Sequence, residues 1–584
     1  MSGATLSPSR ARPLRLPFDL TLGGVLVIAL TVFVGFLVLY PLAFLVAASF
    51  QPAANVADQS LSLEGYRRAL TDTQARTAIV TTLWLSAVRA VLAVVVALFL
   101  AWAITRTNVP GRRVFHGLML VSFFLPNLPQ VLAWTFLLSP RSGSLNVFLR
   151  GLVGSSATSG PFNIYSYEGI IFIGILTWSG FLYLFISPAF RAVDASFEEA
   201  ARMSGATGFR TALRISVPLL APAVLGALGL AFIRMVESFE TELLLGTPAQ
   251  IYVFTTQIYA YIARELTPQY APAIALSTIF VALVLVLVIV QQRVLGGRSF
   301  VTVTGKDHRR APADLGRWKW ALFAVLVLFN VVHLVLPLGM LALGSVQRSV
   351  ALFRLDGFTL DHWKILTSSD VWKAVQNTVI VGVAAAVLGM ALVSLISYVV
   401  TRTRYRARGT LELFTWVPYM VPAFVLGVGF LWAALKGNPL PWVLYGTHAI
   451  LIVALIVRLI PLGSRLMNGT MVQLSRELEE AARMSGATWT RSFRRVVMPL
   501  LSPAVGIGLL MFMVIAIRDL STVILLYGPG STILSAVFYS HWRSGTLEDA
   551  AVIGLLMAAM GLLVALGIVV LQRIGRGRAE APVI

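Results

Sequence analysis

Six ionisable side chains interrupt two long apolar stretches of the sequence. They are Arg234, Glu237, Glu240 and Glu242 in one stretch, and Arg518 and Asp519 in the other. A charge at the centre of a bilayer costs about 2.5–3.5 kcal/mol on insertion scales, so such residues usually face a cavity or a partner. The pattern therefore indicates either a polar pathway through a membrane or a set of internal ion pairs.

The two charged clusters occupy equivalent positions, because Glu237 and Arg518 are separated by the 281 residues of an internal repeat described below. Each lies about 19 residues into its stretch, or about 28 Å at 1.5 Å per residue, which places both toward the outer side. One hypothesis is that the clusters line the outer mouth of a shared pathway, with Glu237 or Asp519 meeting a cationic substrate. The alternative is internal pairing, of Arg234 with Glu237 and of Arg518 with either acid. The pathway hypothesis involves Arg234, Glu237, Glu240, Arg518 and Asp519.

The composition is that of an integral membrane protein, since 58% of the 584 residues are hydrophobic and only 12% are charged. The sequence has no cysteine, which excludes disulfides, thiolate metal sites and thiol catalysis. Its six histidines show no metal-ligand spacing. The "GKD" at 305–307 does not match a phosphate loop, because Asp stands where Ser or Thr should bind magnesium. We therefore predict no catalytic site, no metal site and no bound cofactor, and any ATP chemistry must come from another chain.

Twelve segments are apolar over about 20 residues, the length that crosses a bilayer core. They lie at 20–50, 77–104, 114–138, 167–190, 218–245, 270–291, 320–346, 374–400, 410–435, 448–464, 499–526 and 548–571. The polar, basic segment 293–319 reads as a cytoplasmic linker between the halves 1–292 and 320–584. The third and ninth segments each hold two prolines, which predict packing kinks more than cavity-lining breaks. We expect an all-α polytopic membrane protein.

The basic residues are distributed unequally between the two sides of this topology. With the N-terminus inside, the cytoplasmic pieces contain 30 of the 46 Lys and Arg residues, and the outer loops contain 12. Such a bias is typical of cytoplasmic loops, and it explains the net charge of +21 without nucleic acid. Both termini are therefore expected in the cytoplasm.

The decamer "EEAARMSGAT" occurs twice, at 198–207 and 479–488. Aligned over 198–222 and 479–503, the two copies are identical at 16 of 25 positions. Because each half has an even number of predicted spans, the two halves enter the membrane in the same sense. The sequence thus predicts two parallel six-helix repeats, an arrangement used by transporters.

The physical character of the decamer indicates a docking element. Gly205 and Gly486 supply the positive φ that ends a helix at low cost, so each copy should form a short helix-turn-helix. Alanines place only short side chains on one face of the short helix, and glutamates place negative charges beside that face. A helix lying on lipid would instead need bulky apolar residues opposite Lys and Arg. Docking into another protein is the favoured interpretation, with loops near 191–217 and 465–498.

The two copies also resemble the cytoplasmic signature of permeases from binding-protein-dependent ABC importers. The motif is matched by Glu199, Ala200, Ala201 and Gly205, and by Glu480, Ala481, Ala482 and Gly486. Val217 and Met498 stand where the family has Leu, and Val496 where it has Ile. The two fused halves resemble the ferric-iron type of this family in particular.

This resemblance implies a partner, a substrate class and a location. The motif loops would form coupling helices in a groove of an ATPase. Because the two decamers are identical, we expect them to bind identical sites on one homodimeric ATPase species. A periplasmic or extracellular binding protein would present the cargo at a bacterial inner membrane. The cargo would be ferric iron, or else thiamine, a phosphonate, a polyamine or sulfate. An ion-coupled secondary carrier is the competing class, but it leaves the twin decamers unexplained.

Overall fold

The computed structural model describes residues 22–51, 60–154, 156–192, 203, 205, 214, 217–264, 266–295, 313–350, 357–436 and 442–579. Over these residues the fold is helical, and pairing between extended segments is limited to isolated bridges. The predicted linker 293–319 lies mostly outside the described residues. Its described end, Ala313, donates its N–H to the carbonyl of Arg106 at 2.9 Å and accepts from the N–H of Asn108 at 3.1 Å.

Ten helices in the described part of the chain are long and apolar enough to cross a membrane. They are α1 (Leu22–Ser49), α3 (Thr73–Arg106), α7 (Tyr167–Ala192), α10 (Val217–Val236), α12 (Tyr270–Leu295), α13 (Trp318–Asn330) continued by η4 (Val331–Val335) and α14 (Leu336–Val346), α15 (Ser369–Arg402), α18 (His448–Gln473), α21 (Met498–Arg518) and α23 (Leu547–Ala579). Their order matches ten of the twelve predicted spans.

The other two predicted spans, 114–138 and 410–435, are broken helix pairs and not single rods. The first is α4 (Arg112–Phe124) and α5 (Asn127–Leu138), which meet at 101°. The second is α16 (Ala407–Trp416) with η7 (Val417–Met420), followed by α17 (Ala423–Lys436) at 107°. Pro126 and Pro422 occupy the breaks. A proline lacks an N–H and pushes its preceding residue out of the α region, so the helix ends there.

Both bent pairs cross the membrane, as the directions of their neighbours show. Trp84 of α3 contacts Tyr167 at the start of α7, with ring centroids 5.0 Å apart. Further along both helices, the side chain of Arg89 in α3 packs against Gly174 in α7. The helices α3 and α7 therefore run parallel, and the chain between them must return across the bilayer.

The second half repeats this parallel arrangement. Near the start of both α15 and α18, Asn377 bonds His448 at 2.8 Å. Near their ends, Arg402 donates to the carbonyl of Met471 at 2.9 Å. With α4–α5 and α16–α17 counted as crossings, the described part of the chain has twelve spans, in agreement with the prediction of two parallel six-helix repeats.

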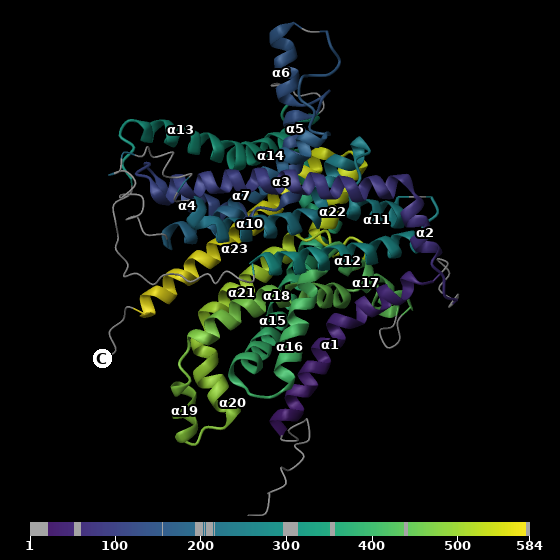
Figure 1. The fold of residues 1–584 in the computed structure, drawn as a ribbon. Coiled ribbons are helices and arrows are strands. Elements are labelled where there is room, and N and C mark those ends of the chain that lie inside the picture. Colours follow the sequence, from purple (N-terminus) through teal and green to yellow (C-terminus); the bar gives the residue numbers. More distant parts are fainter. Residues whose placement is uncertain are drawn as a thin grey trace, which may run out of the picture.

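The first spanning helix of each half packs on the other half (Figure 1). The purple helix α1 lies against α16 and α17 of the second half, and α14 lies against α5 of the first half as well as against α23 of its own half. Glycines permit the close approach: a Cβ on Gly35 of α1 would stand 2.7 Å from the ring of Phe414. The halves are thus interlocked by exchanged helices.

The helices α10 and α21 end earlier than predicted, at Val236 and Arg518 instead of residues 245 and 526. The chain then turns back into two short helices, α11 (Phe254–Ala263) and α22 (Leu534–Ser544). Hydroxyl groups hold both turns, because Thr255 donates to the carbonyl of Ser238 at 2.6 Å and Ser535 donates to that of Asp519 at 2.8 Å. Glu237, Glu240, Glu242 and Asp519 therefore lie beyond the helix ends, which corrects their predicted place within the spans.

The remaining short elements lie between the spans. They are α2 (Glu64–Thr71), α6 (Ser144–Val153), η2 (Glu242–Gly246), η3 (Thr247–Ala249), η6 (Asp361–Thr367), η8 (Trp442–Leu444), α19 (Glu477–Met484), α20 (Trp489–Ser492) and η9 (Phe493–Val497). We call the side of the molecule that bears α19 and α20 the knob face (Figure 1). The helices α10 and α21 begin at this face and end toward the opposite face.

Candidate functional site: a charged cluster on the internal axis

A carboxylate and a hydroxyl from the two halves meet at the centre of the fold. Ser521 donates its hydroxyl to Glu240 Oε1 at 2.8 Å. The two residues are 281 positions apart, which is the offset of the repeat, so each is the other's counterpart. In a two-fold arrangement, a residue that contacts its own counterpart lies on the axis. Glu240 and Ser521 therefore mark the internal two-fold axis, where a pathway shared by both halves must run.

Two ion pairs flank this axial contact. Arg234 donates to Glu237 Oε2 at 2.8 Å, as the pairing alternative predicted. Asp519 forms its ion pair with Arg458 of α18 and not with Arg518. Arg458 also donates to the hydroxyl of Thr522 at 3.0 Å. Two of the three acids in the proposed pathway are thus neutralised by arginines.

The third acid and the remaining arginine have no such neutralising partner among the described residues. Arg518 donates to the carbonyl of Phe123 at 2.9 Å and lies 5.2 Å from the centroid of that ring. Glu240 accepts from Ser521 alone, although Arg458, Arg518 and Asp519 interact with it electrostatically. The cluster therefore presents one carboxylate and one guanidinium, from opposite halves, that are not engaged in ion pairs.

Aromatic rings of the two bent pairs support the arginines across the interface between the halves. Phe123 and Tyr419 correspond at the 296-residue offset of the earlier spans. Arg518 of the second half lies over Phe123, and Arg234 of the first half lies 4.6 Å from the centroid of Tyr419. Each contact joins one half to the other. A guanidinium over an aromatic face is attracted by the ring quadrupole, so these contacts hold the charges at the interface.

Sequence reasoning missed Arg465, which had been assigned to a cytoplasmic loop. Since α18 continues to Gln473, Arg465 is helical and lies two turns from Arg458 on the same face. Its guanidinium stands 4.3 Å from the centroid of Trp416 and 4.8 Å from that of Tyr419. The i,i+7 spacing from Arg458 was the available signal.

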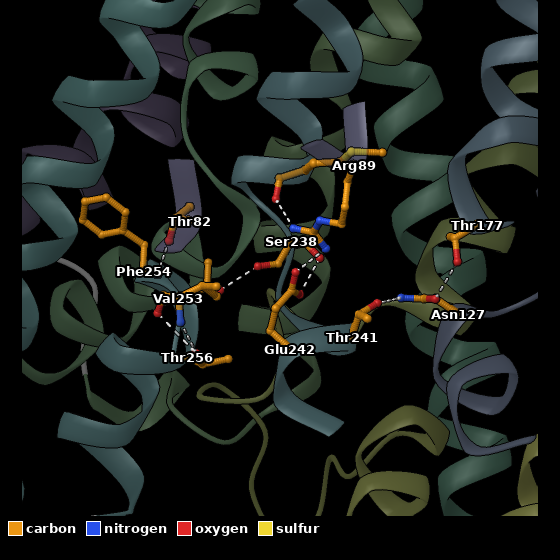
Figure 2. Close-up of polar contacts among 12 residues, drawn as sticks. Thr82, Arg89, Asn127, Thr177, Ser238, Thr241, Glu242, Val253, Phe254 and Thr256 are labelled. Carbon is orange, nitrogen blue, oxygen red and sulfur yellow. Dashed lines mark hydrogen bonds and ion pairs between the residues drawn. The ribbon is translucent and has the colours of Figure 1, made fainter. Parts of the chain in front are cut away.

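Glu242 belongs to a separate buried network that fixes the turn after α10 (Figure 2). Arg89 of α3 bonds Glu242 at 2.5 Å, with side chains that are 2% and 0% exposed. The same guanidinium donates to the carbonyl of Met235 at 3.2 Å, and Ser238 donates to Glu242 Oε2 at 2.6 Å. Because the pair is satisfied and inaccessible, we interpret it as a scaffold and not as part of a pathway.

A second set of polar contacts braces the break in the first bent pair (Figure 2). Asn127, directly after Pro126, donates to Thr241 at 3.1 Å and accepts from Thr177 at 3.3 Å. At the equivalent positions of the second half, Thr522 corresponds to Thr241, but Arg458 stands in place of Thr177. The two halves thus use the same positions with different chemistry.

The knob face carries the duplicated motif. In the second copy, α19 ends at Met484, Gly486 follows with φ of 80°, and α20 begins at Trp489. This is the predicted helix-turn-helix. In the first copy Gly205 has φ of 79°, while Glu199, Ala200 and Ala201 lie outside the described residues. Glycine is needed at both turns because other residues rarely adopt positive φ.

The two glutamates of the second motif differ in their surroundings. Glu480 and Ala481 are exposed and Ala482 is half-buried. Glu479 is buried, accepts from the hydroxyl of Tyr398 at 3.0 Å and lies 3.5 Å from Arg402. Since both partners belong to α15, Glu479 attaches the knob to a spanning helix, a role that the sequence did not reveal.

An exposed methionine occupies the same place in both knobs. Met203 and Met484 are counterparts at the 281-residue offset, and they are 90% and 89% exposed. An apolar side chain that is exposed at both equivalent places indicates a contact surface.

A family model agrees with this duplicated architecture. The model for the "binding-protein-dependent transport system inner membrane component" matches residues 93–296 and 392–576. The two matches together cover more than half of the chain. The chain belongs to this family. It is accordingly an all-α, multi-pass membrane protein whose two halves each contain the family's domain.

Two curated relatives are ferric transport system permease proteins FbpB. The protein of Actinobacillus pleuropneumoniae is 28% identical over 78% of this chain, and the match spans 65% of the relative, just under two thirds. The putative protein of Haemophilus influenzae is 28% identical over 89% of this chain and 80% of the relative. A probable ABC transporter permease of Sinorhizobium fredii is 25% identical over 82% of this chain and 83% of the relative.

The axial cluster lacks the ligands of a resident metal centre. Within the described residues, no group of three or more His, Asp or Glu side chains could hold a metal ion.

We predict that Arg89→Ala destabilises the protein by about 3–5 kcal/mol, because it leaves the Glu242 carboxylate buried without a partner. The double variant R89M/E242M should recover most of the loss. Thermal unfolding in detergent measures both effects, with Arg67→Ala, from an exposed ion pair, as the matched control that should leave stability nearly unchanged. An unchanged midpoint in R89A would show that the pair is not a scaffold.

A second prediction concerns the attachment of the knob. Glu479→Gln removes the charge that faces Arg402 and should raise hydrogen exchange in α19 about tenfold, the effect of losing a charge-assisted bond of 1.5–3 kcal/mol at its lower end. The control is Glu477→Gln, an exposed acid on the same helix. Equal exchange in the two variants would contradict the proposed attachment.

Proposed function

We propose that this chain is the membrane-spanning permease of an ATP-driven importer that moves ferric iron delivered by an external binding protein. The chain supplies the pathway and the knobs, and a separate ATPase supplies the hydrolysis. The observation that carries the proposal is the axial Glu240–Ser521 contact with the ion pairs beside it, combined with Met203 and Met484, which are exposed at equivalent positions of the two decamers.

The orientation is part of the proposal. We place the knob face in the cytoplasm, because most Lys and Arg residues fall in loops on that side. Both chain termini would lie on the same side. The short helices α11 and α22 would then face the outside, where a binding protein delivers its cargo.

Docking to one ATPase species twice is supported by the likeness of the knobs. Their decamers are identical, and Met203 and Met484 are both exposed at equivalent positions. An exposed apolar anchor beside acidic residues fits a pocket with an apolar floor and a polar rim. The contact of Glu479 with Tyr398 and Arg402 would pass a movement of the docked knob to α15.

The choice of ferric iron is supported by the names of the two FbpB relatives and by the state of Glu240. This acid lies on the axis and is half-buried, and among the described residues it has no salt-bridge partner. A carboxylate oxygen is the type of ligand that hard cations prefer. Glu237 and Asp519 are already paired with arginines, so Glu240 replaces them as the acid expected to meet a cation.

A second candidate substrate is an oxyanion such as a phosphonate or sulfate. The specific observation in its favour is Arg518, whose guanidinium reaches a carbonyl and a ring but no carboxylate among the described residues. Competition by sulfate, phosphonate and ferric iron in the same uptake assay separates the two candidates, because only the true cargo competes at low concentration.

Uptake of radioactive ferric iron into proteoliposomes tests the proposal directly. With the ATPase and the loaded binding protein present, uptake should require ATP. Glu240→Gln should lower the rate about tenfold, equivalent to about 1.4 kcal/mol of lost stabilisation of the passing cation. The control Glu412→Gln changes an exposed acid of α16 and should leave the rate unchanged. ATP-independent uptake would instead indicate a secondary carrier, and normal uptake by E240Q would remove Glu240 from the pathway.

A further prediction concerns the knobs. The double variant M203S/M484S should lose ATPase binding in a pull-down from detergent, because both apolar anchors are removed while the helices remain intact. Each single variant should bind at intermediate strength, since the second knob is unchanged. The control L478S alters another exposed apolar residue of α19 and should bind normally. Full binding by the double variant would exclude the methionines as anchors.

A further inference from the structure

Four aromatic side chains surround the internal axis beside Glu240. Phe239 and Tyr259 come from the first half, and Phe424 and Tyr539 come from the second. The rings of Phe239 and Phe424 stack with centroids 4.6 Å apart, and Tyr259 lies edge-on to both, at 5.7 and 6.2 Å. Tyr259 and Tyr539 are 6.4 Å apart. We call these four residues the aromatic seal.

The aromatic seal lies on the internal axis because it also contains two residues that are counterparts and contact each other. Tyr259 is the sixth residue of α11 and Tyr539 is the sixth residue of α22. The two helices are equivalent, because each begins at a residue whose N–H donates at 2.8 Å to the hydroxyl of a matched threonine, Thr82 or Thr378. Tyr259 and Tyr539 are therefore counterparts in contact, and such a contact marks the axis.

The seal and the charged cluster differ in their accessibility. All four aromatic residues are buried, with exposures of 1, 5, 0 and 6% for Phe239, Tyr259, Phe424 and Tyr539. By contrast, Arg234 and Arg458 of the cluster retain side-chain exposures of 33 and 29%. The helix α10 starts at the knob face, carries Arg234 near its end and stops at Val236, so Phe239 lies beyond that end. The partly exposed charges thus lie on the knob side of a buried aromatic layer.

The other side of the seal faces the opposite surface of the protein. Tyr259 and Tyr539 both interact electrostatically with Arg264 and Arg543, at the ends of α11 and α22. These two arginines are exposed. The seal therefore separates an exposed surface from the axial carboxylate.

We propose that Phe239, Tyr259, Phe424 and Tyr539 form the outer gate of the pathway, closed in this structure; the assignment rests on the transport function proposed above. The contacts between Phe239 and Phe424 and between Tyr259 and Tyr539 each join opposite halves. Separation of the halves at this level opens the gate. Ring faces part without breaking backbone hydrogen bonds, and the tyrosine hydroxyls provide polar groups for the hydrated open state.

The cysteine-free sequence allows a direct test. A short bifunctional maleimide should cross-link the variant Y259C/Y539C at rest and stop ferric-iron uptake, while each single-cysteine variant treated in the same way keeps its untreated rate. The matched control W84C/Y167C joins α3 to α7 within one half, and its cross-link should leave uptake unchanged. Absence of the cross-link, or full uptake after it forms, overturns the gate.

A second measurement needs no aromatic substitution. The variant S521C places one thiol at the axial site behind the seal. A membrane-impermeant maleimide added outside should not label it at rest, and should label it at least tenfold faster when the loaded binding protein and a non-hydrolysable ATP analogue are bound. Equal labelling in both states overturns the gate. If the unmodified chain takes up no iron under any condition, the proposed function fails instead, and the labelling result still decides whether the seal closes.

Discussion

A bilayer core provides no water to polar groups, and this constraint determines where every charge and every broken helix of the molecule can lie. A backbone group or charge that enters the core must find its partner inside the protein. The fold meets this requirement with arginines. Arg89 satisfies Glu242, Arg234 satisfies Glu237, and Arg458 satisfies Asp519. The irregular turns after α10 and α21 are stabilised by the hydroxyls of Thr255 and Ser535. Among the described residues of the charged cluster, Glu240 and Arg518 remain outside ion pairs.

The two halves share the same backbone arrangement, but their ion pairs involve different positions. Thr82 and Thr378 bind equivalent amides, and the glycines of both knobs have nearly the same φ. The buried ion pairs do not follow this repeat, because the arginine comes from α3 in the first half and from α18 in the second. A duplicated scaffold with unequal charges leaves Glu240 of one half and Arg518 of the other outside ion pairs among the described residues.

The sequence predicted the spans, their parallel repeat and the helix-turn-helix of the knob, because each depends on local pattern: apolar length, repeated residues and a glycine that ends a helix. It did not predict the right-angle bends at Pro126 and Pro422, since a proline reports a break but not its angle. The predicted alternative in which Arg518 pairs with Asp519 was also wrong. Arg518 is its neighbour in sequence, but the end of α21 points that side chain toward Phe123 of the other half. Arg458 reaches Asp519 only through the packing of α18 against α21.

Burial separated residues that the sequence had grouped together. Glu479 and Glu480 are adjacent, but one faces α15 and the other faces solvent. Glu242 lies in the same apolar stretch of sequence as Glu237 and Glu240, but it is fully buried beside Arg89. The axial contacts of Glu240 with Ser521 and of Tyr259 with Tyr539 required three-dimensional information, because no local pattern shows that a residue touches its own counterpart.

The exchange of α1 and α14 between the halves has a mechanical consequence. Neither half has a complete surface of its own, because each bent pair is covered by a helix that belongs to the other half. A half produced alone would leave an apolar groove open to lipid and would lack one of its walls. Any movement between the halves must therefore also displace these exchanged helices, which couples the two halves mechanically.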